Sequence, residues 1–408
     1  MNSKKKIIND PVFGFITIPN DLLLRLIQHS FFQRLNRIRQ LGLASLVYPG
    51  AQHTRLHHSI GAMHLMDEAI KNLRQKGHEI TQDEANGALA CILLHDIGHG
   101  PFSHVLEYTL TNSVHHEEFS LALMEYLNEE LNGELDICIS IFKNEYPKKF
   151  LHQLVSGQLD VDRLDYLRRD SFFTGVTEGN IGSARIIKML DVKDDKLVVE
   201  AKGIYSIENF LLSRRLMYWQ VYLHKTSVAA EKMMIKTLMR AKLLSDKGIK
   251  LFASPSLQYF LENEVDSSFY KEHKREVLHH FVNLDDNDIW CALKVWSDDN
   301  DIVLSTLSRS LLNRRLFKIE ITNEPPKEEY IRKHISKYVL ELGVDEREAS
   351  FFYSSDVIYT NMYNEDDDSI GILYNDGTIK DISEASDMLN IQLLSKKVKK
   401  YYFSYFKL

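Results

Sequence analysis

The stretch Leu93-Leu94-His95-Asp96-Ile97-Gly98-His99-Gly100-Pro101 carries the densest chemical information in the chain. A histidine and an aspartate stand side by side at the end of a long apolar run, and a second histidine comes one helical turn later. Because side chains at i and i+4 share a face of a helix, His95 and His99 are expected to point into the same space. Imidazole nitrogen and carboxylate oxygen together suit a divalent cation that also binds water and phosphate oxygens. The stretch therefore predicts a metal site where a buried helix ends.

The composition is that of a globular protein with room for two or three domains. The chain has 408 residues, of which 44% are hydrophobic and 26% charged, and its formal net charge is -7. This charge gives no sign of a general nucleic-acid binder, and a phosphate-rich ligand would need a locally basic pocket. The three cysteines are far apart and odd in number, which argues against a disulfide framework and against a cysteine-based zinc site.

The first ten residues lack the apolar core of a signal peptide, and no run of about 18 apolar residues follows. We therefore expect a cytoplasmic protein with no membrane contact.

Apolar residues at helical spacing dominate the first 316 residues. The pattern predicts helices over residues 22–38, 59–73, 83–95, 121–131, 151–154 and 206–242, and a helix capped by Leu284-Asp285-Asp286. A short strand is expected over residues 196–201 and an irregular loop over residues 172–181. This part of the chain therefore predicts a helical body.

The composition changes after about Leu316. Residues 317–321 alternate like a strand, residues 330–342 are helical, and Asn375-Asp376-Gly377 between two apolar runs signals a hairpin. We expect a mainly α protein with a helical body over residues 1–316 and a smaller α+β module over residues 317–408. The basic and aromatic segment 396–403 has two interpretations: contact with nucleic acid or a partner subunit, and, preferred, a basic amphipathic edge packed against its own protein.

Four segments carry side chains that suit one metal site. They are Thr54 to Ser59, His95-Asp96, His115 to Glu118, and Leu159 to Tyr166. Taken singly, each has a structural explanation, since a lone histidine is more often a surface or core residue than a ligand. The aspartates 160, 162 and 165 could form a solvated helix start, where carboxylates favour the helix dipole. His95 and Asp96 are harder to explain in this way, because burying both requires a compensating partner.

These segments resemble the HD-domain phosphohydrolase superfamily, and within it the dNTP triphosphohydrolases. The resemblance runs from about residue 6 to residue 230 and is carried by ordered motifs: Ile8-Asn9-Asp10-Pro11, Phe32-Gln33-Arg34-Leu35, Arg39-Gln40-Leu41-Gly42, Tyr48-Pro49-Gly50-Ala51, Thr54-Arg55 with His58-Ser59-Ile60-Gly61, Leu94 to His104, His116-Glu117, Asp160 to Tyr166, Asp170, and Tyr222 with His224-Lys225. It implies that residues 1–316 form an HD helical core with a helical extension.

The resemblance implies that His58, His95, Asp96 and Asp162 ligate one divalent metal ion. It matches His58 rather than His57, so His57 is expected to be structural. Two imidazoles and two carboxylates leave two octahedral positions for water and a phosphate oxygen. Manganese, iron, nickel, zinc and magnesium all suit this ligand set.

The resemblance also implies a catalytic group made of His99, His104, His116 and Glu117. The preferred assignment places His99 and His116, with Glu117, around the α-phosphate, and makes His104 the general acid toward the sugar oxygen. A helix-capping or core role for His104 stays open. The family usually has an aspartate where this chain has Glu107, which puts the positioning of His104 in question.

Eight further residues match positions that surround the substrate in the family. Basic residues for the phosphates are Arg55, Arg163, Arg214 and Lys225, and residues around the deoxyribose are Gln40, Tyr166, Asp170 and Tyr222. A tyrosine packed against the 2′ carbon would exclude a 2′-hydroxyl and so favour deoxyribose. Two alternatives stay open: Arg214-Arg215 as a charged helix face, and Asp170 as a partner of Arg168 or Arg169.

The function implied is hydrolysis of deoxynucleoside triphosphates to deoxynucleoside and inorganic triphosphate by metal-activated water at the α-phosphate. The alternatives are an HD-type nucleotidase or phosphomonoesterase, and, less favoured, a regulatory protein that binds single-stranded nucleic acid and keeps a residual metal site. A homo-oligomer, dimer or tetramer, is also implied. Where animal members bind an activating nucleotide with charged residues, this chain has Gln28 and Asn36, which argues against that mode of activation. The 317–408 module is expected to serve oligomerisation or to cover the active-site entrance.

Overall fold

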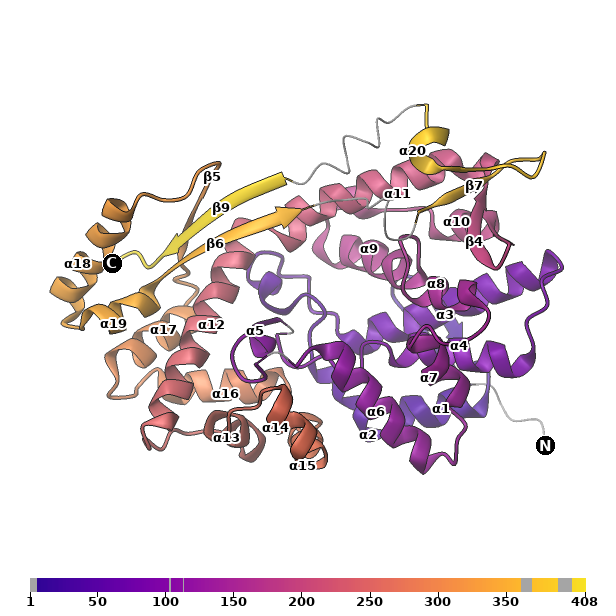
Figure 1. Cartoon of the computed structure of the whole chain (residues 1–408). Coiled ribbons are helices and arrows are strands. Elements are labelled where there is room, and N and C mark those ends of the chain that lie inside the picture. The colour runs from indigo at the N-terminus through magenta and orange to yellow at the C-terminus, as the bar shows by residue number, and fades with distance from the viewer. Residues whose placement is uncertain (1–5, 103, 113, 361–368, 388–397) are drawn as a thin grey trace.

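The computed structural model describes residues 6–102, 104–112, 114–360, 369–387 and 398–408 (Figure 1). Helices form most of this part of the chain, so the expected mainly α fold class is confirmed. None of the described helices has the length and apolar character needed to cross a membrane.

The N-terminal segment begins with a hairpin of β1 (Ile7–Asp10) and β2 (Gly14–Thr17). The single helix predicted over residues 22–38 is wrong, because the chain forms α1 (Asp21–Gln28), α2 (Ser30–Gln33) and a 3-10 turn, η1 (Arg34–Arg37). His29 causes the break: its backbone is extended and its ring nitrogen accepts a hydrogen bond from Phe31 N to start α2. The predicted start is correct, since the Asn20 side chain caps α1.

Three helices form the centre of the body and hold the predicted metal ligands. They are α3 (Arg55–Gln75), α4 (Gln82–Leu94) and α9 (Val161–Thr174), with α3 packed against the other two. The sequence of α4 from Ala88 to Leu94 is fully or almost fully buried. Burial of one leucine or isoleucine side chain stabilises the fold by about 1.5–3 kcal/mol, so this apolar run fixes α4 in the core.

Shorter helices cover this centre. They are α5 (His104–Glu107), α6 (His116–Glu130), α7 (Asp136–Phe142), α8 (Lys149–Val155) and α10 (Ser183–Met189). The predicted irregular segment after residue 172 is partly correct: α9 continues to Thr174, and Gly175 then ends it with a positive φ of 77°.

The long helix predicted over residues 206–242 is wrong. The chain forms α11 (Ile204–Met217), a π-helical turn, η5 (Tyr218–Tyr222), and α12 (Lys225–Asp246). His224 separates the last two elements, and its ring nitrogen accepts a hydrogen bond from Thr226 N to begin α12. Single-turn π segments often mark functional sites.

Five further helices follow α12 at the same end of the molecule, and α13 and α17 among them pack against α12 (Figure 1). They are α13 (Pro255–Glu262), α14 (Ser267–Glu272), α15 (Lys274–Phe281), α16 (Asp286–Trp296) and α17 (Ile302–Leu312). Asp285 caps α16, as its sequence predicts. The Trp296 indole N–H donates to Phe252 O, which satisfies the one polar atom of this buried side chain.

The chain after residue 316 contributes to two separate sheets. One has the order β5 (Lys318–Thr322), β9 (Val398–Tyr405), β6 (Tyr353–Thr360) and lies beside α12, α18 (Glu328–Leu342) and α19 (Glu346–Ala349) (Figure 1). β9 is its central strand; Lys396 and Lys397 of the basic segment lie outside the described residues.

The other sheet lies at the opposite end of the molecule, close to α10 and α11 (Figure 1). Its order is β3 (Leu190–Lys193), β4 (Lys196–Glu200), β7 (Gly371–Leu373), β8 (Ile379–Asp381), and the short helix α20 (Ile382–Ala385) follows. The predicted strand at residue 196 and the hairpin through Gly377, whose φ is +85°, are confirmed. β7 pairs parallel to β4, so the body and the C-terminal segment share this sheet. The division at residue 316 therefore stays a proposal.

Candidate active site

The predicted metal ligands meet where α3, α4 and α9 converge. His58 lies in the first turn of α3, and the neighbouring His57 turns back to complete a capping box with Thr54. His95 is the C-cap of α4, and Asp162 lies in the first turn of α9. The caps explain why His58 points inward while His57 takes the structural role expected of it.

The donor atoms of this cluster face one another. Asp162 Oδ1 lies 3.1 Å from His58 Nε2 and 3.5 Å from His95 Nε2. The oxygens of Asp96 lie 3.8 Å and 3.4 Å from the same two nitrogens. Both Nε2 atoms are buried, yet neither makes a hydrogen bond to any described residue. Buried, unpaired nitrogens that face carboxylates fit a divalent cation, so the ligand set suits a bound metal ion.

Contacts on the far side of each ring hold it in place. His58 Nδ1 lies 2.7 Å from Asp165 Oδ2, and His95 Nδ1 lies 2.6 Å from Ile92 O. Protonated Nδ1 atoms leave the Nε2 lone pairs to the metal, as is usual for histidine ligands. The Arg169 guanidinium in turn donates to both oxygens of Asp165 and to Asp10, and all three side chains are buried.

Gly61 makes room for this ion-pair network. A Cβ atom at this position on α3 would lie 2.0 Å from Asp165 Oδ1 and 2.1 Å from Arg169 Nη2. A larger residue at position 61 would therefore displace the carboxylate that orients His58. The sequence does not reveal Asp165, Arg169 and Asp10 as supporting residues; the i, i+4 spacing of Asp165 and Arg169 is the one signal of their ion pair.

The charges of the cluster favour cation binding. Burial disfavours a charged His58, but Asp162 and Asp165 outweigh it and raise the pKa of His58 to about 10. Burial also opposes ionisation of Asp96 and Asp162. Neighbouring histidines outweigh it and hold the pKa of both carboxyls below the usual range, and at Asp96 the Arg55 guanidinium lowers the pKa as well. His58 therefore holds a proton between these carboxylates, which a metal ion would displace.

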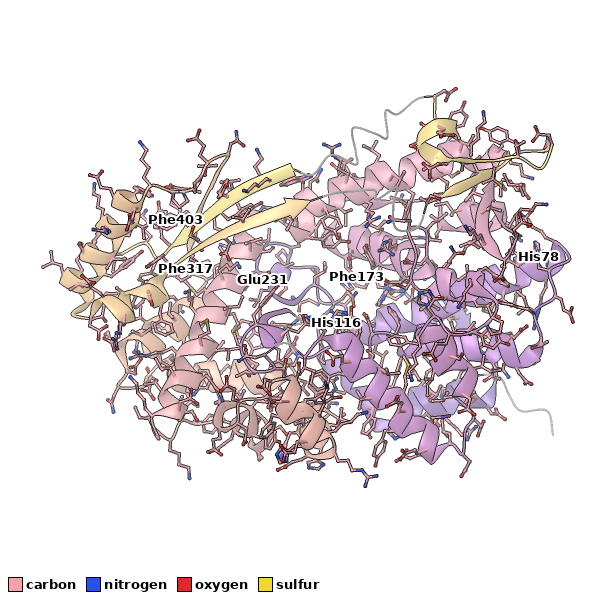
Figure 2. The ribbon with its side chains drawn as sticks, in the orientation of Figure 1. His78, His116, Phe173, Glu231, Phe317 and Phe403 are labelled. Atoms are coloured by element: carbon pink, nitrogen blue, oxygen red, sulfur yellow. The ribbon has the colours of Figure 1, made fainter. Side chains whose placement is uncertain are left out.

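A second histidine cluster adjoins the first. The rings of His99 and His116 stack with centroids 3.9 Å apart, and His99 Nε2 lies 3.2 Å from Asp96 Oδ1. Glu107 Oε1 lies 2.8 Å from His116 Nδ1, whereas Glu117 lies 3.3 Å from the other ring nitrogen and is 64% exposed. Figure 2 labels His116 near the middle of the molecule. Of the two carboxylates, Glu107 is the closer to His116, whereas the sequence connects Glu107 only with His104.

His99 is neutral in this environment. Burial lowers the pKa of His99 to about 3, with Arg55 adding to the effect. The side chain of His104 lies outside the described residues, so its predicted role as general acid stays a prediction.

Burial raises the pKa of Tyr166, and Arg163 and Arg214, two of the four predicted phosphate-binding cations, both oppose that rise, so both lie near this residue of the sugar cavity. Arg55 Nη1 donates to Asp96 Oδ2 over 2.5 Å, directly beside the metal ligands. Arg163 bonds Asp160 and Gly157 O, and lines a polar cavity of about 520 Å³ together with Lys149 and His152. The remaining two differ in burial: Arg214 is buried and donates to Gln158, and Lys225 is exposed at the start of α12.

The four residues predicted around the deoxyribose do come together. Gln40, Tyr166, Asp170 and Tyr222 line one cavity of about 390 Å³, which Arg55 also lines. The Tyr222 hydroxyl donates to Asp170 Oδ2 over 2.8 Å, and His53 Nε2 lies 2.7 Å from Asp170 Oδ1.

These contacts argue against the alternative in which Asp170 is the partner of Arg168 or Arg169. Arg169 pairs with Asp165 and Asp10, and Arg168 donates to Ser183 and to Val12 O, so the described contacts of Asp170 are to His53 and Tyr222. His53 was missed because a single histidine in a loop carries no pattern.

Comparison with known proteins agrees with this geometry. The HD domain model matches residues 55–170, and the model of an HD associated region matches residues 181–253. The uncharacterized protein YwfO of Bacillus subtilis is 31% identical over 94% of this chain and 88% of its own length. The chain belongs to the HD-domain phosphohydrolases. The family expected from the sequence is therefore confirmed.

Two further relatives of this HD-domain protein carry functional names. A crystal structure of a phosphohydrolase from Bacteroides thetaiotaomicron has a TM-score of 0.96 and 62% identity, and the alignment covers 99% of this chain and 100% of that one. A deoxynucleoside triphosphate triphosphohydrolase SAMHD1 homolog of Dictyostelium discoideum is 31% identical over 58% of this chain and 49% of its own length.

Proposed function

We propose that this HD-domain protein hydrolyses deoxynucleoside triphosphates to deoxynucleoside and inorganic triphosphate. Arg55 is the observation that carries the proposal. Its guanidinium donates to Asp96 in the metal cluster, and the same side chain lines the cavity that holds Tyr166, Asp170 and Tyr222. A nucleotide whose α-phosphate lies at the metal cluster can therefore place its sugar in that cavity.

The metal site supplies the hydrolytic chemistry. A divalent cation held by His58, His95, Asp96 and Asp162 would polarise a phosphate oxygen and lower the pKa of water. The donor set admits manganese, iron, nickel, zinc or magnesium. Arg55, beside Asp96, is positioned to bind a phosphate oxygen, for which a guanidinium is well suited.

The histidine cluster handles protons near the phosphate. The neutral imidazole of His99 carries one ring N–H. It can donate this N–H to a phosphate oxygen while the ring stays uncharged. Glu107 orients the His116 ring through Nδ1 and leaves Nε2 on the side of Glu117. We assign proton donation to the departing 5′ oxygen to His104, as the sequence predicts.

The sugar cavity favours deoxyribose. Asp170 is held by Tyr222 and His53, which orients its oxygens to accept a hydrogen bond from the 3′-hydroxyl. The Tyr166 ring lies edge to face with Tyr222 at 5.9 Å between centroids, and this contact restrains it against the sugar. A ribose 2′-hydroxyl would meet the Tyr166 ring.

The direct test incubates the protein with each dNTP, each NTP and each deoxynucleoside monophosphate in the presence of Mn²⁺, followed by chromatography of the products. We expect deoxynucleoside and triphosphate from dNTPs, little product from NTPs, and no activity in a His95→Ala control. Release of phosphate from a monophosphate, with dNTPs left intact, would replace this proposal by a nucleotidase. Homo-oligomerisation stays a prediction that light scattering on the purified protein tests.

A further inference from the structure

The segment at the end of α4, residues 95–99, carries three side chains of the candidate active site, and we call it the metal turn. His95 and Asp96 belong to the metal cluster, and His99 follows, stacked on His116. Residues 95–98 form a turn rather than a regular helix, so its carbonyl oxygens need partners from other parts of the chain. The groups that supply those partners decide where the three side chains point.

The Arg34 guanidinium, from η1, spans the second half of the metal turn. Its Nη2 donates to Ile97 O and its Nη1 to His99 O, each over 2.9 Å, and Nη1 also lies 3.3 Å from Leu284 O. The guanidinium carbon lies 4.8 Å from the centre of the Phe281 ring. The planar fork of an arginine fixes the distance between two acceptors, which a single ammonium group does not. Arg34 therefore ties two carbonyls of the turn to one rigid group.

Arg34 carries a buried charge, and no carboxylate in the described part of the chain forms an ion pair with it. The side chain is fully buried, and burial lowers its pKa to about 9. The nearby carboxylates have other partners: Asp285 pairs with Arg37, and Asp286 accepts from Arg39 N over 3.0 Å. A buried charge without an ion-pair partner is costly, and an apolar side chain of similar volume would avoid that cost. What the guanidinium provides is its bonds to the carbonyls of the metal turn.

A second side chain holds the first half of the metal turn. The Ser120 hydroxyl, from α6, donates to His95 O over 2.7 Å and accepts from Gly98 N over 2.9 Å. The turn is therefore held from two elements, by Ser120 on α6 and by Arg34 on η1.

We propose that Arg34 is a positioning residue that holds the metal turn in the geometry needed for cation binding and for phosphate contact. Its hydrogen bonds all go to backbone carbonyls, so it acts through the turn and not on the substrate. The effect on His95 and Asp96 concerns the metal ion alone. The effect on His99 rests on the proposed function, in which this ring donates to a phosphate oxygen.

The first test measures the Kd of Mn²⁺ for the full chain by competition with a chromophoric chelator. The variants are Arg34→Gln, which removes the charge and the fork, Arg34→Lys, which keeps only the charge, and Ser120→Ala. Arg240→Gln is the matched control, because Arg240 is also buried but pairs with Asp301 and Glu348 beside α17 and α19, distant from α4 (Figure 1). Circular dichroism and urea unfolding establish that each variant is folded and how far it is destabilised.

We expect Arg34→Gln to raise the Kd of Mn²⁺ about tenfold or more, as is typical when a group that orients metal ligands is lost. Arg34→Lys and Ser120→Ala should raise it by smaller factors, because each keeps part of the support. Arg240→Gln should leave the Kd unchanged although it destabilises the fold. A Kd within about twofold of the wild type in the folded Arg34 variants overturns the proposal, as does an equal rise in Arg240→Gln. If Arg34→Gln does not fold, Arg34→Lys decides.

The second test concerns His99 and uses kcat and KM for a dNTP at saturating Mn²⁺. Arg34→Gln should lower kcat about tenfold or more while KM changes by a smaller factor, because a small displacement of a group at the reacting centre costs rate more than binding. A kcat equal to that of the wild type overturns the part that concerns His99. If the wild type hydrolyses no dNTP, the proposed function fails, and the Kd of Mn²⁺ still decides whether Arg34 positions the metal ligands.

Discussion

Asp165→Asn is the sharpest test of how the metal cluster is built. Asp165 holds His58 Nδ1 at 2.7 Å and accepts two bonds from Arg169 at 2.9 Å each. An asparagine keeps one oxygen and loses the charge, so a charge-assisted bond to His58 becomes at best a neutral one. Hydrogen bonds to charged groups contribute about 1.5–3 kcal/mol and neutral ones about 0.5–1.5 kcal/mol. The difference of about 1.4 kcal/mol corresponds to about tenfold in affinity.

We therefore expect Asp165→Asn to weaken divalent metal binding about 10- to 100-fold, the range found when the carboxylate behind a ligand histidine is changed. The matched control is Asp10→Asn, because Asp10 also pairs with Arg169 in the core but does not touch His58. Both variants should lose about 1–3 kcal/mol of unfolding free energy, because each weakens a buried ion pair. Only Asp165→Asn should bind metal more weakly.

The assays are competition for Mn²⁺ or Zn²⁺ with a chromophoric chelator at fixed pH, and urea unfolding in the presence of EDTA. The reasoning is refuted if Asp165→Asn binds metal within twofold of the wild type, or if Asp10→Asn weakens binding as much as Asp165→Asn does.

Three further predictions concern other parts of the fold. Gly98→Ala places a Cβ 2.2 Å from Ser120 N at the start of α6, so we expect about 2–3 kcal/mol less unfolding free energy by urea titration; a loss below 0.5 kcal/mol would contradict this close approach. Tyr222→Phe removes the donor to Asp170 and should lower kcat/KM for dNTPs about tenfold with unchanged metal affinity, and an unchanged kcat/KM would exclude this role. Burial raises the pKa of Asp286 to about 6 in the folded state. Between pH 4 and pH 6 the carboxyl therefore ionises in the unfolded chain but stays protonated in the folded one, so the free energy of unfolding falls by up to about 3 kcal/mol as the pH rises. Asp286→Asn should therefore gain stability relative to the wild type across that interval, and a constant difference in urea unfolding would rule the shift out.

The sequence predicted the metal ligands better than it predicted the residues that hold them in place. The family resemblance implied His58, His95, Asp96 and Asp162 as one ligand set, because short motifs carry them, and their donor atoms face one another in the structure. The network behind them was not visible, because a buried Asp165 has the same sequence pattern as an acidic helix start in solvent. Its burial depends on helix α3 lying across α9, which only the tertiary structure shows.

The sequence also did not predict the two helix breaks. Their cause is local, but it leaves no mark on the hydrophobic periodicity. Residues 22–38 and 206–242 contain neither proline nor glycine at the observed breaks. At both places a histidine, His29 or His224, leaves the helical conformation and caps the next helix with its ring. Propensity and periodicity favour a continuous helix there, and tertiary packing overrides them.

The parallel pairing of β4 with β7 has a consequence for synthesis on the ribosome. β4 pairs on one side with β3, which precedes it, but β7, the partner on its other side, begins only at Gly371, roughly 170 residues after β4 ends. At a synthesis rate of about 5–20 residues per second, this edge of β4 stays unpaired for on the order of ten to thirty seconds before β7 is made. An unpaired strand edge invites pairing with other chains. Co-translational misassembly of this protein is therefore expected to begin at β4, well away from the metal cluster.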